Sequence, residues 1–233
     1  LKILEHEIET MTFGDPIDSS NMNPEYWIKI ANVIYERFDD YDGFVVLHGS
    51  DTMSYTASAL SFMFENLTKP IIFTGSQLPI GDLRTDAKEN LITSIQVAGL
   101  RKNGKPVISE VGLYFEYKLY RANRTTKINA EHFQAFSSMN HPALAESGVY
   151  LSVNYKALWA PNRKQKTKLH TGFDDNILVL KMFPGISEST VEHILAKPEL
   201  KGVVLETYGS GNAPNTSWFL ELLRKKIKEG LFV

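Results

Sequence analysis

The sequence has 233 residues, of which 43% are hydrophobic, so it can bury one large core or two smaller ones. Its formal net charge of -2 gives no general attraction to nucleic acid, and no stretch approaches the roughly 18 apolar residues of a membrane-spanning helix. Because the chain has no cysteine, disulfides and thiolate metal sites are excluded. We therefore expect neither nucleic acid nor a membrane as a partner.

Strand and helix patterns begin at the first residue. We expect a strand at Leu1–Ile8, followed by a helix that Asn23 caps and that has Pro24 at its first position. The apolar residues of this helix recur at helical spacing: Trp27, Ile30, Ala31, Ile34 and Phe38. This spacing predicts that one side of the helix faces a sheet.

The next elements continue the alternation of strands and helices. The apolar run Phe44–Leu47 predicts a parallel strand that is covered on both faces. A helical pattern follows, with these residues on one side: Tyr55, Ala59, Phe62 and Met63. Pro70–Phe73 predicts another buried strand, 90–99 a helix, and 106–118 longer strands of mixed polarity.

The pattern changes near Lys156. Pro161–Lys168 is polar and basic without apolar periodicity, which is typical of an interdomain segment whose charges are solvated. Beyond it the patterns predict strands at 177–182 and 202–205 and helices at 189–195 and 218–227. We therefore expect an α/β fold with a larger, doubly wound N-terminal domain at 1–155, a linker at 156–173, and a smaller, doubly wound C-terminal domain at 174–233.

The segment Gly43–Ser54 places reactive groups directly after a buried strand. It gathers an imidazole, two hydroxyls and a carboxylate between the strand's carboxyl end and the start of a helix. Open α/β sheets bind ligands at this position, and a helix start offers free backbone N–H groups. By spacing alone, the same Ser-Asp-Thr cluster also fits an ordinary helix cap, and His48 also fits a structural histidine.

Five motifs occur in the order expected for one enzyme family. They are D-S-S-N-M at 18–22, H-G-S-D-T-M at 48–53, T-G-S-Q-L-P at 74–79, L-Y-R-x-N-R-T-T-K at 119–127 and Y-G-S-G-N-A-P at 208–214. Together they resemble the loops of the type I (cytoplasmic) L-asparaginases. The resemblance implies the asparaginase-like two-domain α/β fold. It also implies hydrolysis of L-asparagine to L-aspartate and ammonia in the cytoplasm, without a metal or organic cofactor.

The resemblance also assigns roles to residues of this chain. The hydroxyl-lysine-carboxylate triad is Ser50, Lys127 and Asp51, and Asp51 also holds the substrate's α-ammonium. The substrate-binding residues are Asp18, Ser19, Ser20, Gly49 and Ser76, with the two loop serines holding the α-carboxylate. Asn212 approaches the site of a neighbouring subunit, which implies a homodimer or homotetramer. Thr126 and Glu206 correspond to a possible regulatory site.

Three features depart from the family's pattern. Ser50 stands where threonine is usual, so it keeps the hydroxyl and loses the methyl group that restricts χ1. Glu206 stands where some members have arginine, and a carboxylate cannot bind an anion as that arginine does. The T-G-G-T-I segment with the principal threonine nucleophile is absent, so we expect a fragment truncated at both ends.

Two alternatives to the asparaginase hypothesis stay open at this point. One is an asparaginase-like subunit of a tRNA-dependent amidotransferase, which would pass ammonia to a partner protein. The other is a noncatalytic amino-acid-binding module that uses the same pocket. An appended domain would favour the first, and asparagine binding without turnover would favour the second.

Overall fold

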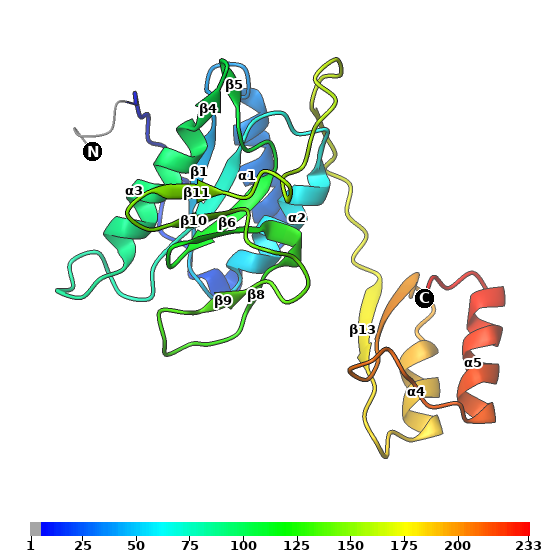
Figure 1. Cartoon of the computed structure of the whole chain (residues 1–233). Coiled ribbons are helices and arrows are strands. Elements are labelled where there is room, and N and C mark those ends of the chain that lie inside the picture. Colours follow the sequence, from blue (N-terminus) through cyan, green and yellow to red (C-terminus); the bar gives the residue numbers. More distant parts are fainter. Residues whose placement is uncertain (1–5) are drawn as a thin grey trace. The chain divides into compact units, whose positions relative to one another are not determined.

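The computed structural model describes residues 6–233, which form two compact units that divide after Thr171 (Figure 1). The strand expected at Leu1–Ile8 lies mostly outside the described residues, and 6–8 are not a strand. Within 6–233, no helix has the length and apolar character needed to cross a membrane.

The first unit is built on a six-stranded mixed sheet with the strand order β1-β3-β6-β7-β10-β11. Its strands are β1 (Phe44–Leu47), β3 (Ile71–Thr74), β6 (Val111–Phe115), β7 (Lys118–Arg121), β10 (Ala145–Ser147) and β11 (Leu151–Val153). The first three are parallel, which confirms the parallel strand predicted at Phe44–Leu47, and the others pair antiparallel. The sequence patterns did not predict this antiparallel extension. The strand β6 is fully buried, although 106–118 was predicted to have mixed polarity.

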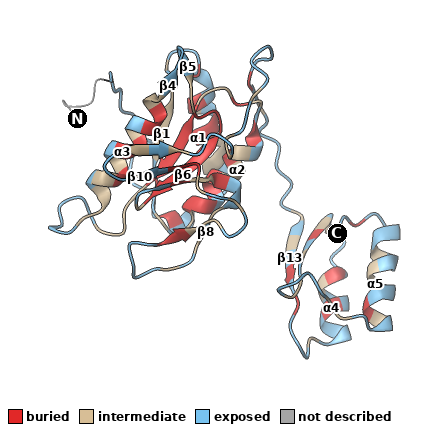
Figure 2. Cartoon of the chain, viewed as in Figure 1, coloured by how far each residue is buried: buried red, intermediate tan, exposed pale blue. Residues whose placement is uncertain are grey.

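Helices cover both faces of this sheet, which confirms a doubly wound first unit. The helices are α1 (Pro24–Glu36), α2 (Met53–Met63) and α3 (Ala87–Gly99). Ile71 and Phe73 of β3 belong to the core under α1 and α2, whereas Ile72 between them belongs to the core under α3. This alternation is the two-residue period of a strand buried on both sides, and Figure 2 shows the central strands largely buried.

The predicted inner side of α1 is confirmed. Asn23 caps the helix by accepting a hydrogen bond from the backbone N–H of Tyr26 at 3.2 Å. Of the apolar residues that recur at helical spacing, four are buried: Ile30, Ala31, Ile34 and, just beyond the helix end, Phe38. The helix α2 differs from the pattern, because Tyr55 and Phe62 are 68% and 74% exposed. Of the residues expected on one side, Met63 is buried, and it shares the inner side with Met53, Thr56, Ala57 and Leu60.

Short elements complete the first unit. They are the 3-10 turns η1 (Ser19–Asn21) and η2 (Ala122–Arg124) and the strand pairs β4–β5 (Arg101–Lys102, Lys105–Pro106), β8–β9 (Thr126–Lys127, Phe136–Ser137) and β2–β12 (Phe64–Glu65, Lys168–Leu169). In the last pair, β12 lies in the segment expected as a linker, whereas β2 directly follows α2. Asn66 also holds this segment by bonds to Asn162 and Gln165. Most of 156–171 therefore packs on the first unit.

The second unit contains two parallel strands and two helices. They are β13 (Ile177–Lys181), α4 (Glu188–Leu195), β14 (Gly202–Glu206) and α5 (Ser217–Lys228), close to the predicted elements. Both helices pack on one face of the strand pair, and the core there includes Leu180, Val191, Val203 and Phe219. The other face carries the exposed side chains of Ile177, Val179 and Val204. The expected doubly wound arrangement is thus not found within this unit, because both helices lie on the same side.

Candidate active site

The site lies where the carboxyl ends of two neighbouring parallel strands meet. The backbone N–H of His48, directly after β1, donates to the carbonyl of Thr74 at the end of β3 at 2.9 Å. A β-carbon on Gly75 would lie 2.3 Å from the carbonyl oxygen of His48, so only glycine fits this close approach. The loops at 48–52 and 75–79 therefore start side by side, as expected for a ligand site at a sheet edge.

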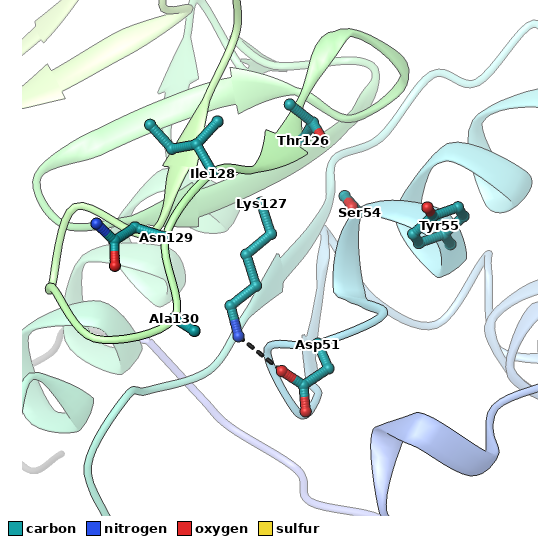
Figure 3. A pocket seen from close by; sticks show the side chains of 8 residues that line it. All are labelled: Asp51, Ser54, Tyr55, Thr126, Lys127, Ile128, Asn129 and Ala130. Atoms are coloured by element: carbon teal, nitrogen blue, oxygen red, sulfur yellow. Dashed lines mark hydrogen bonds and ion pairs between the residues drawn. The ribbon is translucent and has the colours of Figure 1, made fainter. Parts of the chain in front are cut away.

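Lys127 reaches this edge from β8 and contacts both predicted partners. Its Nζ donates to Ser50 Oγ at 2.9 Å and to Asp51 Oδ1 at 2.7 Å. The Lys127 side chain is 15% exposed, whereas that of Asp51 is 65% exposed. Figure 3 shows the lysine extending from its strand to the carboxylate. The fold thus brings together three polar groups whose positions are up to 77 residues apart in the chain.

Gln77 is a member of this cluster that the sequence reasoning missed. The hydroxyl of Ser50 donates to its Oε1 at 3.2 Å. The residue lies in T-G-S-Q-L-P, but only its neighbour Ser76 was assigned to the site. Ser76 lies half-buried in the same loop. The available signal was a long amide side chain directly after Ser76, which was itself a predicted site residue. No spacing rule connected this side chain to Ser50.

The serine loop at 18–22 packs against the reactive loop at 48–52. Ser19 is buried, and Thr52 Oγ1 donates to its carbonyl oxygen at 2.6 Å. A β-carbon on Gly49 would lie 2.6 Å from Ser19 Oγ, so glycine permits this contact. Ser19 therefore lies beside the loop that carries the triad.

The two neighbours of Ser19, Asp18 and Ser20, are hydrogen-bonded to each other. The backbone N–H and the hydroxyl of Ser20 donate to Asp18 Oδ1 at 2.9 and 2.8 Å. The backbone bond, and then the hydroxyl bond, hold the pKa of Asp18 below its usual value because they stabilise the charged form. Asp18 thus caps η1, and the Ser20 proton is already donated within the loop.

His48 is held inside the protein. Its Nδ1 lies 2.7 Å from the carbonyl oxygen of Gly49, and its Nε2 lies 2.9 Å from Thr56 Oγ1. A carbonyl only accepts, so Nδ1 carries the proton and Nε2 accepts from the threonine hydroxyl. Trp27 Nε1 donates to the same threonine oxygen at 3.1 Å. Burial lowers the pKa of His48, so the structural interpretation of this residue fits its surroundings.

An open pocket of about 400 Å³ lies next to the triad (Figure 3). Its lining residues are Asp51, Ser54, Tyr55, Thr126, Lys127, Ile128, Asn129 and Ala130. A carboxylate, an ammonium group and hydroxyls therefore surround one small volume. Such a set can bind a compact zwitterion through opposite charges and hydrogen bonds.

The remaining predicted residues lie on the surface. Thr126 is exposed on β8 at the pocket wall. Glu206 and Asn212 belong to the second unit. Glu206 Oε1 accepts from Lys181 Nζ at 2.9 Å, and Asn212 Nδ2 donates to Ser210 Oγ at 3.1 Å. Both residues are exposed, and their contacts are within the second unit.

Family models match most of the chain. Residues 4–159 match the N-terminal domain of asparaginases, and residues 176–233 match the glutaminase/asparaginase C-terminal domain. The chain belongs to the asparaginase family. This membership confirms the family resemblance and the two-domain α/β fold that the loop motifs implied.

Individual relatives agree with this assignment. L-asparaginase 1 of Escherichia coli K12 is 45% identical over 217 residues, which are 93% of this chain and 62% of that protein. The crystal structure of L-asparaginase I from Vibrio cholerae has a TM-score of 0.84 and 43% identity, covering 93% of this chain and 64% of that one. The 60 kDa lysophospholipase of Mus musculus is 43% identical over 93% of this chain and 37% of that protein. The chain thus spans less than two thirds of each of these relatives.

One relative bears on the amidotransferase alternative. A glutamyl-tRNA(Gln) amidotransferase subunit of Sulfolobus acidocaldarius is 35% identical over 92% of this chain and 48% of that protein. It is therefore a more distant relative than the asparaginases above. The sequence distance favours the asparaginase hypothesis over this alternative.

Proposed function

We propose that this chain supplies the asparagine-binding loops and the proton-transfer triad of an L-asparaginase. The observation that carries the proposal is the position of Lys127 Nζ, within hydrogen-bond reach of both Ser50 Oγ and Asp51 Oδ1. Acid-base catalysis requires such contact distances between the groups that exchange a proton. The asparaginase names of the relatives above agree with this chemistry.

The proposed reaction is hydrolysis of the side-chain amide of L-asparagine. Asp51 neutralises the α-ammonium group, and Ser19 holds the α-carboxylate, while its neighbour Ser20 contributes only by exchanging its hydroxyl bond to Asp18 for one to the substrate. Lys127, held beside Ser50 and Asp51, takes up the proton of the attacking group and returns this proton to the departing ammonia. The amide C–N bond breaks, and water supplies the oxygen that bonds to the carbonyl carbon. By resemblance, the principal threonine nucleophile belongs to a T-G-G-T-I segment that these 233 residues do not contain.

The test uses a chimera in which the aligned residues of this chain replace the matching part of E. coli L-asparaginase 1. We expect the chimera to release ammonia from L-asparagine, and we expect this release to be lost in a Ser50→Ala, Lys127→Met double variant. Calorimetric binding of L-asparagine without ammonia release would instead favour the amino-acid-binding module. Release of ammonia that depends on a tRNA-charging partner would favour the amidotransferase alternative.

We also propose that the whole protein is a cytoplasmic homodimer or homotetramer in which Asn212 completes the site of a neighbouring subunit. The family resemblance supports this, together with the exposure of Asn212. Asn212→Ala in the chimera should impair turnover, and mixing it with a Ser50→Ala chimera should restore part of the activity. An active chimera that is strictly monomeric in light scattering would rule out a shared site. Thr126 stays a candidate regulatory residue, whereas the carboxylate of Glu206 is already paired with Lys181.

A further inference from the structure

Gln77 makes more contacts around the triad than any role assigned above requires. Its side chain bonds Ser50 on one side and the loop that follows Lys127 on the other. Its backbone is also fixed, because its N–H lies 3.0 Å from each carboxylate oxygen of Asp86, which immediately precedes α3. Gln77 therefore connects three separate segments of the site, and its bonds to Asp86 hold its own backbone in place.

The chemistry of its neighbours decides the orientation of the Gln77 amide. Nε2 lies 3.1 Å from the carbonyl oxygens of both Ala130 and His132. Carbonyl oxygens only accept, so the NH₂ group must face them. The other end of the amide, Oε1, consequently faces Ser50 as an acceptor.

This orientation fixes the proton of Ser50. Its Oγ has two polar neighbours, the donor Lys127 Nζ at 2.9 Å and the acceptor Gln77 Oε1 at 3.2 Å. The single hydroxyl proton must therefore point to Gln77, while a lone pair accepts from the lysine. Serine lacks the methyl group that restricts χ1 in threonine, so its hydroxyl direction depends on such partners.

We propose that Gln77 is a positioning residue that sets the direction of the Ser50 hydroxyl and ties it to the loop at 128–135. This role goes beyond the triad and rests, for turnover, on the proposed function. The loop carries protected amides: those of Ile128 and Asn129 donate to the carbonyl of Ala135, and those of Glu131 and His132 donate to Asn129 Oδ1. Their exchange with solvent reports how firmly Gln77 holds the loop.

The first experiment measures amide hydrogen exchange of 128–132 in the 233-residue chain and needs no activity. Gln77→Met removes the bonds to both carbonyls, so exchange should become about tenfold faster. Gln134→Met, at an exposed glutamine of the same loop, should leave it unchanged. Ser50→Ala should speed exchange in the parent chain but have no further effect in the Gln77→Met background. Unchanged exchange in Gln77→Met, or equal effects of Ser50→Ala in both backgrounds, would overturn the proposal.

The second experiment measures steady-state kinetics in the chimera. Gln77→Met should lower kcat by about tenfold, the effect of one lost hydrogen bond that orients a reacting group, with KM nearly unchanged. A rise in KM alone would contradict the positioning role. If the chimera with Gln77 is itself inactive, the proposed function fails, and the exchange experiment still decides whether Gln77 positions Ser50 and the loop.

Discussion

Replacing Lys127 by methionine separates catalysis from folding. Methionine retains an unbranched, flexible side chain and removes the charge that contacts Ser50 and Asp51. Loss of an acid-base group lowers turnover by about 10²-fold or more, which is about 2.7 kcal/mol of barrier at about 1.36 kcal/mol per factor of ten. The same substitution removes an ion pair whose carboxylate is 65% exposed. Such a pair contributes about 0 to 1 kcal/mol to folding.

We therefore expect a large loss of turnover with a small loss of stability. Turnover is measured in the chimera as ammonia released from L-asparagine, and stability as the urea midpoint of the same protein. Lys168→Met is the matched control, because this lysine pairs with Glu65 at 3.8 Å on an exposed surface and should leave both quantities nearly unchanged. Near-normal turnover in Lys127→Met would remove the lysine from the mechanism. A stability loss as large as the barrier increase would show that its role is structural.

Three further predictions address binding, pH dependence and packing. Ser19→Ala should weaken calorimetric asparagine binding by the chimera about tenfold, from a lost charged hydrogen bond of about 1.5 to 3 kcal/mol. Ser20→Ala should weaken it less, since that hydroxyl donates to Asp18, and equal affinity in Ser19→Ala would contradict the assignment. Burial lowers the pKa of His48 below its ordinary value of 6.5, so stability should be fully present above pH 6.5 and fall as the pH drops toward the lowered pKa. This fall should shrink in His48→Gln, and an unchanged urea-midpoint pH profile would exclude His48 as its source. Gly75→Ala should cost about 1 to 3 kcal/mol because its β-carbon would overlap a backbone carbonyl, while Gly81→Ala has open space around it; equal urea midpoints would refute the packing argument.

Local pattern was sufficient for most helices and for the parallel strands. The inner side of α1 could be predicted because helical spacing and an Asn-Pro start both act within a few residues. The strand β1 and the reactive loop after it could also be recognised, since an apolar run ends abruptly in polar groups. The pattern failed in α2, where Tyr55 and Phe62 are exposed although they are apolar. Periodicity shows on which side of a helix the apolar residues gather, but packing against the rest of the protein decides which side is buried.

The candidate site divides in the same way. The sequence by itself, through its motifs, named Ser50, Asp51 and Lys127 as residue types suited to amide hydrolysis. Only the tertiary structure decided that a lysine 77 positions away lies within 2.9 Å of Ser50, because β7, η2 and β8 carry it back to the sheet edge. It also decided the place of Gln77, whose two amide ends face different segments of the chain. Hydrogen bonds act over about 3 Å in space, and no rule of sequence spacing determines which distant loops reach that distance.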